Sequence, residues 1–287
     1  MTELIDEKSK NQIQDDAELE KIEIELLLEG MYRYYGFDFR YYSFPFIQRR
    51  IWYRIRAEKL KSISGLQEKV FHDPDLMKRF YADFSINVTE MFRDPSFFLS
   101  FRNKVIPKLR EYPFIRIWHA GCSVGQEVYS MAILLHEEGI YDKTKIYATD
   151  MNGTLLEEAK SGVFPLERMQ MYTKNYLEAG GTRAFSEYYT VKQDKVIFHP
   201  FLRENVVFAQ HNLATDHSFN EFHIIICRNV MIYFNKSLQN HVHQLFYESL
   251  SLSGFIGLGN REGIRYTRYA DHYEEFDSAE RMYRKIK

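Results

Sequence analysis

Two glycines and two carboxylates mark the part of the sequence whose residue types could bind a nucleoside. Gly121 and Gly125 lie in WHAGCSVGQEVYSMAILL (118–135), where a short apolar run gives way to a helical pattern. Asp150 ends the next apolar run, KIYATD, 25 residues after Gly125. Glycines let a ligand approach the backbone without a Cβ clash, and a strand-end aspartate can accept hydrogen bonds from both ribose hydroxyls. The pattern therefore predicts a nucleoside site.

Glu127 narrows the choice of nucleoside. The glycine spacing is G-x-x-x-G, without the third glycine of a dinucleotide loop, and the carboxylate at 127 would repel a pyrophosphate. A ligand with an ammonium group and no phosphate suits this loop better, which favours S-adenosylmethionine over NAD. On these residues alone, a simple tight turn with Asp150 as a helix cap stays open as an alternative.

The elements that must position these residues alternate between strand and helix patterns. The expected strands are 114–121, 145–150, 205–213, 222–229 and FIGLGN after Gly254, and the expected helices are EVYSMAILLHEEG, LLEEAKSG and KSLQNHVHQLFYESLSLSG, the last ending at Gly254. This alternation predicts an α/β fold with a Rossmann-like, largely parallel sheet and helices on both faces. Residues 163–204 break the rhythm around a Gln193–Asp194 turn, which predicts a small inserted antiparallel β-hairpin subdomain.

The segments before the sheet pattern predict an extension and a helical domain. Residues 1–20 are polar and mixed in charge, and are expected to form a flexible extension. Helical patterns over 21–85 predict an N-terminal helical domain, with Gly36 as a helix stop and Asp73 as a cap before Pro74. The sheet domain is then expected over 86–287.

Composition excludes several classes of protein. A net charge of −2 gives no global basis for binding nucleic acid. No apolar run approaches the roughly 20 residues of a membrane span, and the polar start is unlike a signal peptide, so a cytoplasmic protein without membrane insertion is expected. The 2 cysteines cannot build a disulfide framework, and the 10 histidines show no ligand spacing, so no metal is expected.

Five segments resemble the motifs of the CheR-type chemotaxis receptor glutamate methyltransferases. They are NVTEMFRDPSFF (87–98), WHAGCSVGQEVYSMAILL, YATDMN (147–152), the pair Asn212–Leu213 and CRNVMIYF (227–234), in matching order and spacing over roughly residues 25–285. The resemblance implies a class I methyltransferase sheet, S-adenosylmethionine as methyl donor and S-adenosylhomocysteine as product. It also implies transfer to glutamate side chains in the helical cytoplasmic region of a chemoreceptor or similar signalling protein, and a monomer is expected.

The same resemblance implies the residues of the site. The cofactor-binding positions are Asn87, Thr89, Arg93, Gly121, Glu127, Asp150, Asn212, Leu213, Arg228 and Asn229, and the catalytic positions are Arg93 and Tyr233. Two segments depart from the family pattern. GQEVYS stands where G-E-E-P-Y-S is usual, so that Gln126 replaces a carboxylate and Val128 a proline. GNRE (259–262) stands where G-H-S-E is usual, which changes the rim of the site.

The implied chemistry explains why no general base stands out. A glutamate has a pKa of about 4.3 and is already an anion at pH 7. Its attack on a sulfonium cation cancels charge, so the site should align the two partners and exclude water. Arg93 could hold the incoming carboxylate, and Tyr233 could form one wall.

A basic run over residues 49–61 is open to two interpretations. It is either a solvated helix face or a docking surface for an acidic receptor helix, with Arg49, Arg50 and Arg54 as the tentative docking residues. Two alternatives for the whole protein also remain. One is a catalytically weak S-adenosylmethionine-binding signalling module, and the other is a methyltransferase for a different acceptor.

Overall fold

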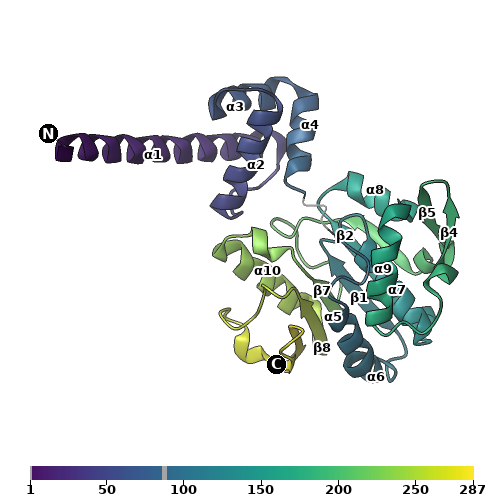
Figure 1. The fold of residues 1–287 in the computed structure, drawn as a ribbon. Helices are drawn as coiled ribbons and strands as arrows, with labels where there is room; N and C mark the ends of the chain where they lie inside the picture. Colours follow the sequence, from purple (N-terminus) through teal and green to yellow (C-terminus); the bar gives the residue numbers. More distant parts are fainter. Residues whose placement is uncertain (1, 86–88) are drawn as a thin grey trace. The chain divides into compact units, whose positions relative to one another are not determined.

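The computed structural model describes the backbone of residues 2–85 and 89–287, and their side chains from Asp15 onward. The chain forms two compact units, drawn in Figure 1. One comprises Met1–Ser85 with Tyr233–Leu238, and the other comprises Ile86–Ile232 with Gln239–Lys287. None of the helices in the described ranges combines the length and apolar character that a membrane span requires.

The first unit is built on four helices, α1 (Thr2–Tyr35), α2 (Phe44–Ala57), α3 (Ile63–His72) and α4 (Pro74–Asp83). Its helix ends follow the predicted signals. Gly36, with φ of +77°, follows the last residue of α1. Asp73 caps α4, since its side chain accepts hydrogen bonds from the backbone N–H groups of Asp75 and Leu76 at 3.1 and 3.0 Å.

The beginning of the chain differs from the prediction. Residues 1–20 were expected to form a flexible extension, but α1 begins at Thr2 and continues without a break to Tyr35. The segment contains no proline, has no glycine before Gly30, and is rich in Glu, Lys, Leu and Gln. These residues have high helix propensity, so polar composition alone did not indicate an irregular segment.

The second unit contains a seven-stranded sheet in the order β6-β2-β1-β7-β8-β10-β9. Its strands are β1 (Ile115–Ala120), β2 (Thr144–Asp150), β6 (Val206–Gln210), β7 (Phe222–Cys227), β8 (Leu250–Leu258), β9 (Tyr273–Asp277) and β10 (Met282–Lys285). The first five are parallel, while β10 is antiparallel to β8 and to β9. This confirms the predicted Rossmann-like sheet. The chain turns to opposite sides of β1, toward β2 and then toward β7, so the strand order reverses between β1 and β7.

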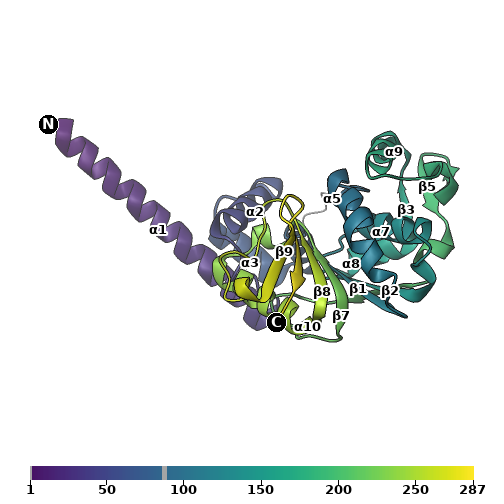
Figure 2. The same cartoon turned by 90° about the horizontal axis from the view of Figure 1, so that it is seen from below.

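Helices cover both faces of this sheet. Trp118 and His119 are successive residues of β1, so their side chains point to opposite faces, and each contacts a different helix. Nδ1 of His119 lies 3.4 Å from Oε1 of Glu127 on α7 (Gln126–Glu137), on one face. The ring of Trp118 lies 5.4 Å from that of Phe246 on α10 (Lys236–Ser249), on the other. Figure 2 shows α7 and α8 (Gly153–Ser161) beside the strands.

The end of α10 is a correction to the predicted helix. Expected to reach Gly254, the helix ends at Ser249, and β8 begins at Leu250. A Cβ at Gly254 would lie 2.9 Å from the backbone oxygen of His223 on β7. Gly254 therefore permits a close approach of strands where the pairing register of β7 and β8 shifts, rather than stopping a helix.

The insert has the predicted antiparallel character. A three-stranded sheet, β3-β5-β4, is formed by β3 (Val163–Pro165), β4 (Tyr189–Lys192) and β5 (Lys195–Phe198). The turn between β4 and β5 lies at Gln193–Asp194, with φ of +58° at Gln193. A helix that the sequence pattern did not indicate, α9 (Met169–Glu178), lies between β3 and β4.

Candidate active site

The glycine loop, residues 121–125, follows β1 at the carboxyl edge of the sheet. The N–H groups of Gly121 and Cys122 both donate to the backbone oxygen of Thr149, at 2.8 and 2.9 Å. Gly121 has φ of +75°, and a Cβ there would lie 2.5 Å from Cγ2 of Val230 in the loop after β7. Glycine is therefore needed both for the backbone conformation and for the close approach of two loops. Ligands of open α/β sheets bind at this place, where the strand order reverses.

Asp150, the last residue of β2, holds the glycine loop. Its Oδ2 accepts a hydrogen bond from N of Ser123 at 2.9 Å, and its Oδ1 accepts one from N of Asn152 at 2.9 Å. Burial raises the pKa of this carboxyl, although the backbone hydrogen bonds act in the opposite direction. Each carboxylate oxygen can accept more than one hydrogen bond, so Asp150 retains acceptor capacity for ribose hydroxyls.

Three charged side chains, of which Arg228 is buried and Glu127 and Asp94 are half-buried, form a cluster beside this loop, here termed the Arg228 cluster. Nη1 of Arg228 lies 2.7 Å from Oε2 of Glu127, and Nη2 lies 2.6 Å from Oδ2 of Asp94. The guanidinium also lies over the ring of Phe97, with 4.2 Å from Cζ to the ring centroid. One cation between two anions leaves the cluster with a net charge of −1. The predicted acidic character of the site is thus present, but it belongs to the cluster rather than to Glu127 alone.

The charge of Glu127 is strongly stabilised by its neighbours. Burial alone would raise the pKa of this carboxyl, but Arg228 and the nearby His119 outweigh that effect and lower the pKa to about 2. Nδ1 of His119 lies 3.4 Å from Oε1 of Glu127, a longer contact than a hydrogen bond to a carboxylate. Glu127 is therefore ionised at every pH at which the protein would work.

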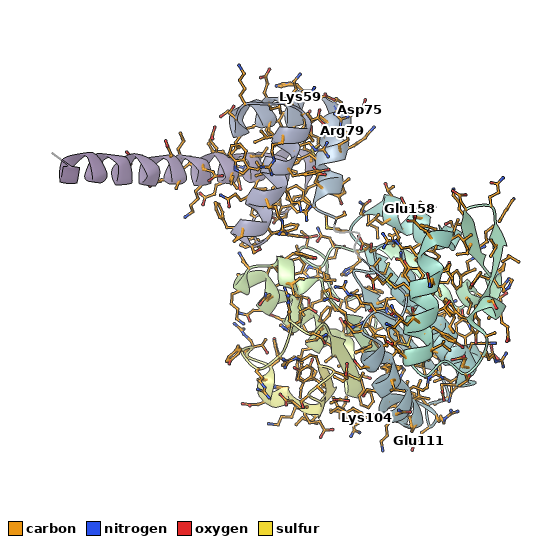
Figure 3. The ribbon with its side chains drawn as sticks, viewed as in Figure 1. Lys59, Asp75, Arg79, Lys104, Glu111 and Glu158 are labelled. Carbon is orange, nitrogen blue, oxygen red and sulfur yellow. The ribbon has the colours of Figure 1, made fainter. Side chains whose placement is uncertain are left out.

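A Glu127→Gln variant should be less stable than the parent by roughly 3 kcal/mol at pH 7, from the difference between a pKa of 4.5 and one of about 2. A lowered native pKa stabilises the fold above the unfolded-state value, and this contribution is lost as the pH falls through the native value. Urea denaturation at pH 7, 4 and 3 should therefore show a shrinking difference. Glu158→Gln, at an exposed position on α8 labelled in Figure 3, is the control. An equal loss at all three pH values would assign the effect to packing.

Arg93 is held by its two neighbours. Phe92 and Asp94 have φ of +51° and +55°, a conformation rare for residues other than glycine. Phe92 is fully buried, and its N–H donates to Oγ of Ser130 on α7 at 2.8 Å. The backbone oxygen of Arg93 accepts from Nη1 of Arg228 at 3.1 Å. The structure thus brings the segment containing Arg93 to the Arg228 cluster, and the role of its half-buried side chain stays a prediction.

The other predicted cofactor residues lie in surrounding loops. Thr89 is half-buried, and Asn87 lies outside the described residues. Leu213 is buried in the turn after β6, where Oδ1 of Asn212 accepts from N of Ala214 at 3.0 Å. This turn lies close to β2, because N of His211 donates to the backbone oxygen of Asp150 at 3.1 Å.

The loop that contains Asn229 is held by a buried carboxylate, Glu262, which the sequence pattern did not assign to the site. Asn229 has φ of +62°, and its N–H donates to Oε2 of Glu262 at 2.9 Å. The same carboxylate accepts from N of Val230 at 2.9 Å and from N of Gly259 at 2.7 Å. Glu262 is buried, and burial raises its pKa despite these hydrogen bonds. Its only sequence signal is that GNRE retains the final glutamate of the family motif.

Several buried polar atoms around the glycine loop have no hydrogen-bond partner within the described chain. They are Oγ of Ser123, Oε1 of Gln126, Nε of Arg228 and Nε2 of His119. Buried polar atoms are normally paired, so this group fits a site that a polar ligand completes. The described residues contain no cluster of three or more His, Cys, Asp or Glu side chains arranged to hold a metal.

Tyr233, the other predicted catalytic residue, belongs to the helical unit. Its backbone oxygen accepts from N of Ser43 at 2.8 Å, and its ring lies 5.0 Å from that of Phe46 on α2. The segment that begins at Tyr233 also pairs with this unit through the bridge between Tyr42 and Phe234. Its place as a wall beside the transferred methyl stays a prediction.

The predicted docking arginines of α2 have different environments. Arg49 is exposed, and Arg50 is half-buried, with its guanidinium 5.3 Å from the ring of Phe46. Arg54 is a correction to the prediction, because it is buried. Its Nε and Nη2 donate to both oxygens of Asp83 at 2.7 and 2.8 Å, and its Nη1 donates to Glu58 at 3.0 Å. It joins α2 to α4 and is not available to an acidic partner.

Two family models match this chain, one in each of its two structural units. Residues 87–280 match the family model for the SAM-binding domain of CheR methyltransferases, and residues 22–85 match the model for their all-alpha domain. The chain belongs to the CheR methyltransferase family. Membership of the CheR family assigns the glycine loop, Asp150 and the Arg228 cluster to a domain that binds S-adenosylmethionine.

Relatives in the CheR family are similar over most of their length. The chain is 48% identical over 264 residues to Cher3 of Pseudomonas putida, which its name describes as a methyltransferase, covering 92% of this chain and 97% of that one. It is 30% identical to a chemotaxis protein methyltransferase of Listeria monocytogenes, covering 80% and 85%. It is 29% identical to one from Borreliella burgdorferi, covering 90% and 93%.

Proposed function

We propose that this chain is a protein-glutamate O-methyltransferase that acts in the cytoplasm on the helical region of a chemoreceptor or similar signalling protein. The observation that supports it most directly is the Arg228 cluster, whose net charge is −1, beside the glycine loop and Asp150. A phosphate-bearing cofactor would meet these carboxylates, whereas a phosphate-free nucleoside with an ammonium group complements them. The names of the relatives from Listeria and Borreliella point to chemotaxis proteins as acceptors.

When bound, S-adenosylmethionine supplies a methyl group on a sulfonium. An oxygen of the acceptor glutamate forms a bond to the methyl carbon while the carbon–sulfur bond breaks and its electron pair stays on sulfur. The products are a methyl ester and a neutral thioether, and no proton moves. The described site accordingly needs no general base. In this proposal its residues bind the nucleoside, with Asp150 at the ribose, and Phe97 packs against the guanidinium of Arg228.

The function is tested by incubating the full chain with methyl-labelled S-adenosylmethionine and the cytoplasmic fragment of a chemoreceptor. Label that becomes volatile methanol in alkali identifies a carboxyl methyl ester. A fragment with glutamine in place of its candidate glutamates should stay unlabelled. Tight binding of S-adenosylhomocysteine without any ester would instead indicate a binding module or another acceptor.

We also propose that the exposed face of α2 docks the acceptor. This docking face differs from the one expected from the sequence, because it excludes the buried Arg54. Arg49, Tyr53 and Arg56 are exposed and follow one another at positions i, i+4 and i+7, which is one face of a helix. Basic and aromatic side chains on one helix face suit an acidic, helical partner.

Reversal of Arg49 and Arg56 to Glu should raise the KM for the receptor fragment about tenfold, because two attractive contacts become repulsive. The affinity for S-adenosylhomocysteine should not change. Lys69→Glu, at an exposed position on α3, reverses a charge elsewhere on the same unit and should have little effect. Equal KM values for all three proteins would show that this face does not dock the acceptor.

A further inference from the structure

The loop between β8 and β9, residues 259–272, carries exposed cations at the edge of the candidate site. Arg261 and Arg268 are both exposed, and within the described chain neither has an ion-pair or hydrogen-bond partner. Arg265 lies between them but is paired with Glu275, at 2.8 Å from Nε to Oε1. Two cations of this loop therefore remain available to a ligand, while Asp271 lies at its far end.

The loop is fixed to the site at its beginning. Glu262 follows Arg261 directly, and its carboxylate is hydrogen-bonded to the backbone N–H groups of Asn229 and Val230. Val230 in turn lies against Gly121 of the glycine loop. Arg261 is thus one residue from a buried anchor that joins the loops after β7 and β8 at the carboxyl edge of the sheet.

The remainder of the loop is also held by specific contacts. Ile264 is buried, and its backbone oxygen accepts from both N and Oγ1 of Thr267, at 2.9 and 2.8 Å. The ring of Tyr269 stacks on Tyr247 of α10, with 4.6 Å between centroids. Between these anchors, 87% of Tyr266 is exposed. Since an aromatic side chain loses apolar contact with water when it binds a partner, such exposure on an ordered loop is typical of a binding surface.

We infer that Arg261, Tyr266 and Arg268 form a second recognition surface that binds acidic side chains flanking the target glutamate. This inference rests on the proposed function, since it takes the acceptor to be an acidic protein segment. Arg261 adjoins the site and Arg268 lies farther along the loop, so the surface suits an extended or helical segment rather than a single carboxylate. Two available cations on a protein of net charge −2 fit an acidic polypeptide better than nucleic acid, whose binding needs many phosphate contacts.

The test measures binding of a fluorescent helical peptide of about 20 residues with Glu at every third or fourth position, by anisotropy at low salt. In the full chain, Arg261→Gln and Arg268→Gln should each weaken binding about two- to fivefold, the size expected for one partly exposed charge contact. The double variant should lose about tenfold, and the affinity for S-adenosylhomocysteine should stay unchanged. A peptide with Gln in place of Glu should bind none of these proteins.

Lys108→Gln is the matched control, because it removes one exposed cation from α6 (Ile106–Leu109), which precedes β1 at the opposite, amino edge of the sheet. Figure 3 labels Lys104 and Glu111 on either side of it in the sequence, at the end of the domain away from Glu158. The inference is overturned if the peptide does not bind, if Lys108→Gln weakens binding as much as Arg261→Gln, or if an RNA oligonucleotide binds through the two arginines and the peptide does not.

Methylation assays separate this inference from the proposed function. If Arg261→Gln forms methyl esters with an unchanged KM for the receptor fragment, the recognition surface fails and the enzymatic function stands. If the parent protein binds the acidic peptide through Arg261 and Arg268 but forms no ester, the recognition surface stands and the enzymatic function fails.

Discussion

Replacement of Arg228 by methionine is expected to lower the free energy of unfolding by about 3–5 kcal/mol and to abolish binding of S-adenosylhomocysteine. The Arg228 side chain is only 1% exposed and holds two carboxylates, those of Glu127 and Asp94. Removal of one member of a buried ion pair leaves charge without compensation, which is strongly destabilising. Here two anions would repel each other beside the glycine loop. Urea denaturation and calorimetry at pH 7 measure the two effects.

Arg102→Met is the matched control for this variant. Arg102 is 8% exposed and also lies between two carboxylates, at 2.6 Å from Glu137 and 2.7 Å from Glu138. These lie at the other end of α7, so a similar loss of stability should leave cofactor affinity unchanged. Arg228→Lys, which keeps the charge but lacks the planar fork, should fold and bind more weakly than the parent. Parental affinity in Arg228→Met would remove the Arg228 cluster from the site.

Replacement of Asp150 by alanine is expected to weaken the binding of both S-adenosylmethionine and S-adenosylhomocysteine by roughly 100-fold. Two hydrogen bonds from ribose hydroxyls to a charged acceptor contribute about 1.5 kcal/mol each, and about 3 kcal/mol corresponds to 100-fold in affinity. Loss of the hydrogen bond to N of Ser123 should also loosen the glycine loop. Calorimetry with each ligand provides the measurement.

The free energy of unfolding of Asp150→Ala should change less than its affinity for the two ligands. Because burial raises the pKa of Asp150, keeping the carboxylate ionised at pH 7 opposes folding, and its removal offsets part of the lost hydrogen bonding. We therefore expect the free energy of unfolding to fall by no more than about 1–2 kcal/mol. Glu158→Ala on α8 should change neither quantity (Figure 3). Unaltered affinity in Asp150→Ala would show that this carboxylate does not contact the ligand.

Local sequence patterns were sufficient to predict turns, helix caps and strand ends, because a short segment determines each of them. The glycines at 121 and 125 and the strand-end Asp150 are such features, because loop geometry and strand polarity follow from neighbouring residues. The cap at Asp73 and the turn at Gln193–Asp194 are predictable for the same reason. At Asp73 the bonded groups lie within three residues of the side chain that signals them, whereas the hydrogen bond from N of Ser123 to Asp150 spans 27 residues and follows from the pairing of β1 with β2.

Side-chain contacts between segments far apart in the sequence could not be predicted from local residue patterns. Glu127 and Arg228 are 101 residues apart, so their pairing depends on the adjacency of β1 and β7. The burial of Arg54 depends on Asp83, 29 residues away on α4, although helical spacing alone places Arg50 and Arg54 on one face. Likewise, the role of Glu262 emerges only when the loops after β7 and β8 meet.

The position of Glu262 has a consequence for how related enzymes diverge. The carboxylate of Glu262 is bonded to N of Asn229, 33 residues earlier in the chain, while Arg261 directly before it is exposed. With Arg261 in the inferred recognition surface, an exchange at 261 would alter partner preference without displacing the strand ends that Glu262 holds. Acceptor choice and donor affinity would then be separable by substitution, because the inferred acceptor contact and the buried anchor are different side chains.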